Sequence, residues 1–206
     1  MRMKASAMDP IGHLRTITKH HNLVCGYCMR AGLVRQGLTH DLSKLSPTEF
    51  LVGMRYYQDG KRSPNNAERE ATGVSAAWLH HKGRNRHHFE YWIDYAPDVN
   101  EPQSKGLAGM KMPRRYVAEM VFDRVSASRV YLGEAYTQEE PLKYFLKSKD
   151  KSWYIHPETK KQLEFLLRMW AVKGEDATVD YIRDVFLKKK RCRRHHRNSR
   201  KGANQS

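Results

Sequence analysis

The apolar residues of this chain recur with the three- and four-residue spacing that is typical of amphipathic helices. In the segment 10–32, Ile17, His21, Val24 and Cys28 follow this spacing, which predicts a helix with a histidine inside its apolar face. No alternating β-branched run of strand length occurs, so we expect an all-α fold. By the same periodicity, further helices are predicted at 46–57, 74–82, 86–94, 114–133, 140–147, 157–172 and 177–189.

Several helix boundaries are indicated by capping residues and prolines. Ser46, Pro47 and Glu49 have the spacing of an N-cap serine, an N1 proline and the N3 glutamate of a capping box, which would open the helix that runs through Tyr57. The stretch 60–66 reads as a loop. N1 positions are also predicted for Pro113, Pro141 and Pro157.

Positive charge is concentrated at the C-terminal end. The chain of 206 residues has 38 Lys and Arg against 22 Asp and Glu, a net charge of +16, which favours phosphates or anionic surfaces as partners. Nine of these cations lie in 188–206, where there is no acid and little to bury. We therefore expect one helical domain over 1–187 and a disordered basic tail at 188–206. The tail is either a solvated appendage or a salt-sensitive contact to nucleic acid without sequence specificity.

The remaining composition argues against membrane insertion and export. No run approaches 18 apolar residues, and the N-terminal segment before Pro10 has no apolar signal-peptide core. Three cysteines are an odd number, which does not suit a scaffold held by disulfides. We expect a cytoplasmic protein with reduced thiols; the sequence does not determine its oligomeric state.

The histidines suggest a metal site, since eight of the 11 fall in four adjacent pairs. His40 and Asp41 are neighbours, so an imidazole and a carboxylate can reach one ion while the second carboxylate oxygen bridges to another. Asp123 shares a helix face with Met120 and Ala127, where an uncompensated acid would be costly to bury. This combination suits one or two divalent transition-metal ions, such as Fe, Mn, Zn or Ni.

Eight residues are candidate metal ligands, and the sequence leaves open which member of each histidine pair binds. Gly83 and Asn85 are expected to break the helix between two of the pairs. The candidates are His20, His40, Asp41, His80, His81, His87, His88 and Asp123.

The order of these residues resembles that of HD-domain metal-dependent phosphohydrolases, in which His, His-Asp, His and Asp follow one another. The run from His40 to Lys44 is similar to the His-Asp-Ile-Gly-Lys run of HD-GYP phosphodiesterases, and the segment 123–131 resembles the aspartate segment of their last helix. The Gly-Tyr-Pro motif is missing, and the histidines at 80–88 are more compact than in that class. The closer match, over roughly residues 10–172, is to an uncharacterised family from bacteria and phages with the motifs HDLSK and AWLHHKGRNRHHFEYW.

The HD-domain resemblance implies an HD-like helical bundle that hydrolyses a nucleotide or a related phosphoester with a metal-activated water. Lys44 and Arg84 would hold phosphate oxygens, and Glu49 would transfer a proton unless it serves only as a capping residue. Glu119 would accept a hydrogen bond from a ligating imidazole or pair with Arg115 instead. Further contacts to ligands or substrate are assigned to Asn85 and Tyr91.

Two other functions stay open at this point. An HD-like di-iron oxygenase would use similar ligands to activate oxygen, and it would show an iron requirement and oxygen consumption. A non-catalytic nucleic-acid-binding protein would hold a structural ion in a closed coordination shell and show no turnover.

Overall fold

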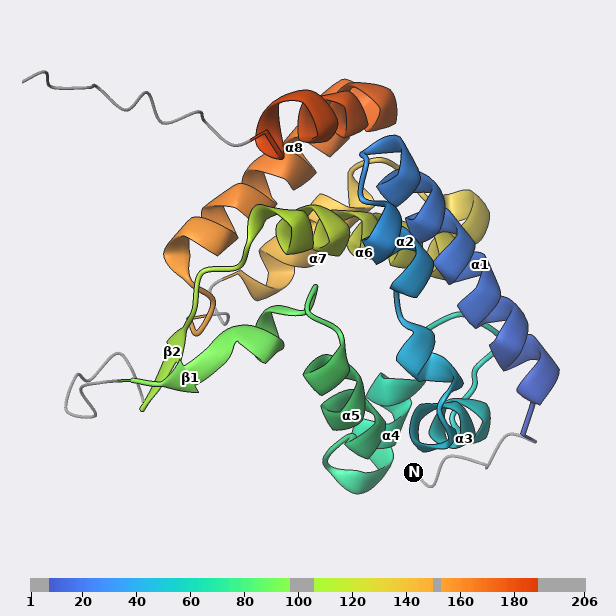
Figure 1. The fold of residues 1–206 in the computed structure, drawn as a ribbon. Coiled ribbons are helices and arrows are strands. Elements are labelled where there is room, and N and C mark those ends of the chain that lie inside the picture. Colours follow the sequence, from blue (N-terminus) through green and yellow to red (C-terminus); the bar gives the residue numbers. More distant parts are fainter. Residues whose placement is uncertain (1–7, 97–105, 150–152, 189–206) are drawn as a thin grey trace, which may run out of the picture.

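The computed structural model describes residues 8–96, 106–149 and 153–188, and it confirms a mainly α-helical fold (Figure 1). Most of the predicted helices are present, with boundaries within a few residues of those expected. The eight α-helices of the described chain are α1 (Pro10–Arg30), α2 (Val34–Thr39), α3 (Pro47–Arg55), α4 (Pro64–Thr72), α5 (Ala76–Arg84), α6 (Arg114–Leu132), α7 (Glu140–Ser148) and α8 (Pro157–Tyr181).

One predicted helix is wrong. In the segment 86–94 the structure has a 3-10 helix, Phe89–Trp92, followed by strand β1 (Ile93–Tyr95). Strand β1 pairs antiparallel with β2 (Leu107–Gly109), with Asp94 opposite Ala108. Strands of three residues are too short to produce a recognisable alternation, which explains why the sequence did not reveal them.

Other boundaries also differ from the prediction. Helices α2 and α4 were not expected, and α4 begins inside the predicted loop at 60–66. Pro113 is the N-cap of α6 and not its first residue, whereas Pro157 does open α8. The predicted interruption between 172 and 177 is a break inside α8 at Gly174, whose φ of 83° is accessible to glycine.

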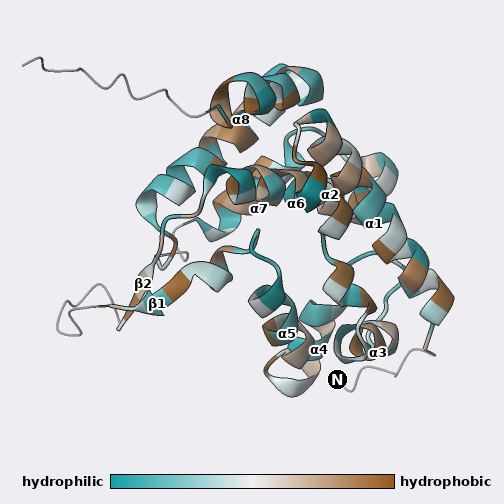
Figure 2. Ribbon diagram, in the orientation of Figure 1, coloured by the Kyte–Doolittle hydropathy of each residue, from teal (hydrophilic) through white to brown (hydrophobic). Residues whose placement is uncertain are grey.

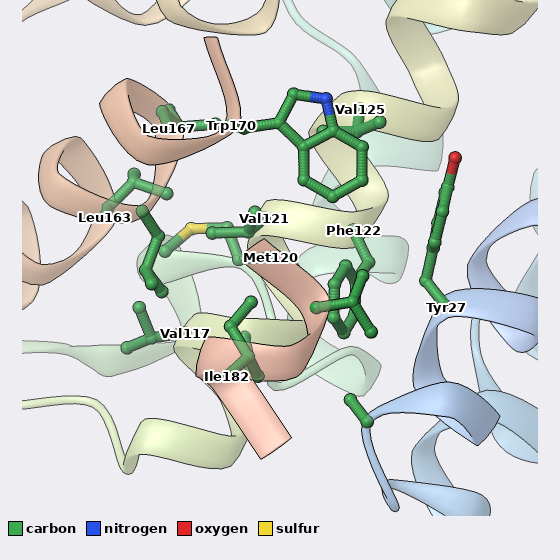
Figure 3. Close-up of a cluster of buried hydrophobic side chains, with 14 of the residues drawn as sticks. Tyr27, Val117, Met120, Val121, Phe122, Val125, Leu163, Leu167, Trp170 and Ile182 are labelled. Atoms are coloured by element: carbon green, nitrogen blue, oxygen red, sulfur yellow. The ribbon is translucent and has the colours of Figure 1, made fainter. Parts of the chain in front are cut away.

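The apolar core lies between α1, α6 and α8 (Figure 3). Tyr27 of α1 stacks on Phe122 with ring centroids 5.5 Å apart and meets Trp170 edge-on at 5.3 Å. Helix α6 is buried around most of its circumference, as expected of a central helix. On the outer helices, hydrophobic and hydrophilic residues are interspersed (Figure 2).

Helices α3, α4 and α5 form a separate layer, which Figure 1 shows below α1 and α2. Among the described residues, none from this layer belongs to the main apolar core. Each of its helices buries one small residue and one ionisable residue. These pairs are Gly53 and Glu49 in α3, Ala67 and Glu68 in α4, and Ala77 and His81 in α5.

Two predictions concern the periphery. In the described part of the chain, no helix has the length and apolar character needed to cross a bilayer. The predicted basic tail at 188–206 lies outside the described residues, except for Lys188.

Candidate metal centre

The ligand candidates converge where the α3–α5 layer meets α1 and α6. His20 comes from α1 and Asp123 from α6, while His40 and Asp41 lie between α2 and the 3-10 helix Leu42–Leu45. His81 lies near the end of α5, and the helix stops at Asn85 as expected. His87 and His88 therefore lie on a non-helical segment that is free to turn toward the other ligands.

Four of these residues, His20, His40, Asp41 and Asp123, form a group that could hold a metal ion, and we call this group the first ion position. The Nε2 atoms of His20 and His40 are 3.3 Å apart. Asp123 Oδ1 lies 3.1 Å from His20 Nε2 and 3.7 Å from His40 Nε2. Asp41 Oδ2 lies 3.7 Å and 3.5 Å from the same two nitrogens.

The second ion position comprises Asp41, His81, His87 and His88. Asp41 contributes its other oxygen, Oδ1, which lies 3.3 Å from His81 Nε2 and 3.4 Å from His87 Nε2. The Nε2 atoms of His81 and His88 are 2.8 Å apart. Asp41 is thus the one residue that belongs to both positions.

These separations suit ions more closely than they suit hydrogen bonds. Ligands at about 2.0–2.2 Å from a tetrahedral ion lie about 3.3–3.6 Å from one another, close to most of the distances observed. Asp41 Oδ1 and His87 Nε2 are buried and have no hydrogen-bond partner in the described structure. An unsatisfied buried carboxylate oxygen is costly, and an ion between these atoms would compensate it.

Buried carboxylates contact the imidazoles at Nδ1, on the side of each ring that faces away from the ion positions. Glu119 Oε1 lies 3.1 Å from Nδ1 of both His40 and His87, so one oxygen can accept two N–H groups. Glu49 Oε2 lies 2.7 Å from His81 Nδ1. Each carboxylate can accept the Nδ1 proton, so that Nε2 is the atom that faces an ion position and would coordinate once its own proton has left, which is the usual arrangement around ligating histidines.

The electrostatics of the cluster favour added positive charge. Burial lowers the pKa of His40, but the carboxylates of Asp41 and Asp123 outweigh burial and raise it to about 10. His81 behaves similarly, and Asp41 raises its pKa to about 9. Burial, assisted by Lys44, lowers the pKa of His20 to about 4. The carboxylates thus draw protons onto two imidazoles, where a divalent cation would provide the same compensation.

Lys44 is the cation nearest to the shared carboxylate. Its Nζ lies 2.6 Å from Asp41 Oδ2, and 28% of its side chain is exposed. Asp123 is the more exposed partner of the first ion position, at 16%, whereas Asp41 and His40 are almost completely buried. The edge marked by Lys44 and Asp123 is therefore a side of the centre that solvent reaches, and His88 of the second group is also partly exposed.

His80 and Glu49 do not have the roles predicted for them, which were metal ligand for His80 and capping or proton transfer for Glu49. His80 belongs to neither ion position, since its Nδ1 faces Glu49 Oε1 at 2.7 Å. Ser46 is the N-cap of α3 and Pro47 opens the helix, as predicted, but the hydrogen bonds of the capping box are absent. The Ser46 side chain makes no capping hydrogen bond, and the Glu49 carboxylate turns inward to His80 and His81. Glu49 thus positions a candidate ligand.

The remaining predicted residues divide into two groups. Asn85 is buried beside the centre, and its Nδ2 donates to the His81 carbonyl at 2.9 Å and to Ser43 Oγ at 2.7 Å. Arg84 is exposed, and its guanidinium contacts the backbone oxygen of His80. Tyr91 is also exposed and packs against Arg86. The structure therefore brings Asn85 to the centre, but not Arg84 or Tyr91.

Ser43 is a contact that the sequence did not single out. Its Oγ accepts the Asn85 hydrogen bond and lies 3.3 Å from His81 Nδ1. Its place two residues after Asp41 was the available signal, but serine is too common near helix starts for that position to be distinctive.

Comparison with known proteins places most of the chain in a family. Residues 10–169 match the model of a family described as a family of unknown function, DUF5662. Neither a search of curated proteins nor a search of solved structures finds a match.

Proposed function

This chain belongs to the DUF5662 family of unknown function, and from its own site we propose a divalent-metal-dependent phosphohydrolase that acts on a nucleotide or a related phosphoester. One observation carries the proposal: two four-residue groups share the Asp41 carboxylate, and the Lys44 ammonium lies against that same carboxylate. Divalent ions held by these two groups, together with the Lys44 ammonium, would offer positive charge to a phosphoryl group.

The donor set suits such ions. The first position offers two imidazoles and two carboxylates, and the second offers three imidazoles and the shared Asp41. Imidazole and carboxylate together suit Fe, Mn, Zn or Ni. When bound, such ions would polarise a phosphoryl oxygen and lower the pKa of a coordinated water.

The protein would contribute positioning and charge. Glu119 would hold His40 and His87, and Glu49 would hold His81, with each Nε2 directed at an ion position. The imidazole rings would then not need to rotate when an ion binds. Lys44 would exchange part of its contact with Asp41 for a non-bridging phosphoryl oxygen and offset the charge that develops there.

The exposed edge supports catalysis over a purely structural ion. A structural centre is closed by protein ligands, whereas a catalytic centre keeps a position that substrate can reach. Here the partly exposed Asp123 and Lys44 are next to the first ion position.

The test compares Lys44→Met with the wild-type protein in metal content and in turnover across a panel of nucleotides and cyclic dinucleotides. Metal should stay, because Lys44 is no ligand, and turnover should fall about 10²-fold or more, the scale for losing one electrostatic stabiliser. Lys61→Met, which alters an exposed lysine, is the matched control and should behave as wild type.

Three results would count against the proposal. Wild-type turnover by Lys44→Met at full metal occupancy would exclude the phosphate role of Lys44. Oxygen consumption with an iron requirement would point to the oxygenase, and full ion loading without turnover of any phosphoester would point to a structural centre.

A further inference from the structure

An open groove lies along the outer face of α8, where the end of α7 approaches this helix. The residues that line it include Lys149, Lys160, Lys161, Glu164, Phe165 and Arg168. None of these residues belongs to an ion position. In Figure 1, α8 lies above α6 and the α3–α5 layer lies below it, so the groove is separate from the metal centre.

The groove carries an excess of positive charge. Four cations line it against a single acid, Glu164. The two carboxylate oxygens of Glu164 lie 2.9 Å from Lys149 Nζ and 2.8 Å from an Arg168 guanidinium nitrogen. Lys160 donates a hydrogen bond to the Lys149 carbonyl. One acid thus fixes two of the cations in place, and three positive charges are left uncompensated within the groove.

Phe165 is an aromatic residue on this charged face. The neighbouring residues Leu163 and Leu167 are completely buried in the core, whereas Phe165 is 50% exposed. Tyr181, from the later part of α8, packs against Phe165 with ring centroids 5.5 Å apart. A single exposed apolar residue is common on protein surfaces, but this ring is supported on one side and lies in a cationic groove.

The spacing along α8 places Phe165 between cations. Lys161 is four residues before it and Arg168 three residues after it, so the three side chains share one helix face. The rise from Lys161 to Arg168 is about 10 Å, which is the length of about three nucleotides of a strand. Proteins that bind single strands combine a cationic groove for the phosphates with an aromatic ring on which a base stacks.

We propose that this groove binds single-stranded nucleic acid, with phosphates on Lys160, Lys161 and Arg168 and a base stacked on Phe165. The net charge of +16 and the nine cations of 188–206, which follow α8, favour a polyanion as partner. The segment 188–206 contains no Phe, Tyr or Trp. A contribution of the bases to binding therefore comes from the groove and not from this segment.

The first experiment tests stacking on Phe165 by fluorescence anisotropy with the full-length protein. The probes are an oligothymidylate of about eight nucleotides and an abasic strand of the same length. Phe165→Ala should raise the Kd for oligothymidylate roughly 5- to 150-fold, the scale for losing one stacked base, and should leave the Kd for the abasic strand unchanged. Phe165→Leu, which keeps apolar bulk against Tyr181, should be equally weak, whereas Phe165→Trp keeps a ring and should bind as the wild type does.

The second experiment tests the phosphate contacts through the dependence of binding on salt. Lys160→Gln combined with Lys161→Gln should weaken binding of both strands and reduce the slope of log Kd against log salt concentration by about 1.4, since each contact to a single strand contributes about 0.7. The matched control, Lys19→Gln combined with Arg35→Gln, changes two exposed cations on α1 and α2 and should leave the Kd and the slope unchanged.

Three results would overturn the proposal. Wild-type binding of oligothymidylate by Phe165→Leu, or an equal loss for oligothymidylate and the abasic strand, would exclude stacking on Phe165. A loss in the Lys19 and Arg35 control as large as that in the groove variant would show that net charge alone determines binding. Tighter binding of polyglutamate than of oligothymidylate would assign the groove to an acidic peptide.

Discussion

Asp41 is the residue on which both ion positions depend. Its backbone is left-handed, with φ of 54°, a conformation that aspartate tolerates better than most residues. The turn directs its side chain between the two histidine groups, so that each oxygen faces one of them. A strained residue that is buried, charged and shared by two groups is typical of a functional site.

The shared position of Asp41 predicts different metal stoichiometries for different variants. Asp41→Ala should abolish binding of both ions, whereas Asp123→Ala and His88→Ala should each leave about one ion per chain, because each removes a ligand from a single position. Elemental analysis of the purified proteins measures these contents.

His80→Ala is the matched control for this series. His80 is adjacent to His81 but lies outside both ion positions, so the variant should retain both ions. Two ions in Asp41→Ala would exclude a shared carboxylate, and a loss in His80→Ala equal to that in His81→Ala would show that the wrong histidine has been assigned.

Metal binding should also depend on pH. In the metal-free protein the pKa is about 10 for His40 and about 9 for His81, so at pH 7 both imidazoles carry a proton that must leave before Nε2 can coordinate. We expect release of about two protons as both positions fill, and affinity that rises from pH 6 to pH 9. Titration calorimetry in buffers of different ionisation enthalpy counts the protons; a heat independent of the buffer would contradict this expectation.

At the scale of elements, the α3–α5 layer is held mainly by polar contacts. Glu49 joins α3 to α5 through His80 and His81, and Glu68 of α4 accepts hydrogen bonds from Ser75 and from the Ala76 backbone. The main apolar core contributes nothing to this layer among the described residues. Ions that join His81 to Asp41 would therefore add a link between the layer and the rest of the molecule, beside the packing of Phe50 of α3 on His13 of α1.

Removal of metal should loosen this layer selectively. Because ligand binding stabilises by mass action, free metal at 100 times its Kd should slow amide exchange in α3, α4 and α5 by about 100-fold, where the exchange rate follows the population of the open state. Exchange in α6 and α8, which form the apolar core, should change little. Hydrogen exchange with mass spectrometry, with and without metal, makes the comparison.

Asp41→Ala provides the control for this exchange experiment. It should exchange rapidly in the α3–α5 layer whether or not metal is added, since neither position can fill. Equal protection of this layer in metal-free and metal-loaded wild-type protein would show that the layer is stable on its own contacts.

At the scale of the whole molecule, the charge is divided between the helical body and the C-terminal end. Deletion of 188–206 removes nine of the 38 Lys and Arg. It should leave helicity, metal content and turnover of a small phosphoester unchanged, while retention on DNA or RNA falls and becomes less sensitive to salt. Circular dichroism and nucleic-acid binding at two salt concentrations test this; an insoluble or metal-free truncation would show that the segment belongs to the domain.

The spacing of apolar residues within each segment was sufficient to predict most of the helices. The periodicity of Ile17, Val24 and Cys28 predicted α1, and the spacing of apolar residues predicted α6 and α8, since helix formation depends on neighbours three or four residues away. It failed at 86–94, where the structure has a 3-10 helix and strand β1, whose pairing with β2 lies beyond the three- or four-residue range of a helical pattern. It also missed the short helices α2 and α4.

The types of ligand could likewise be predicted from the sequence, but their assignment could not. His20, His40, Asp41 and Asp123 were candidates from the sequence because His40 and Asp41 are neighbours, because Asp123 shares a helix face with apolar residues, and because the order of all four resembles that of HD-domain proteins. Only the tertiary structure decided that His81 faces Asp41 while His80 does not, and that Glu49 turns inward instead of capping its helix. These outcomes depend on contacts such as that between His40 and Glu119, 79 residues apart, because burial and hydrogen bonding are set by whichever segments the fold brings together.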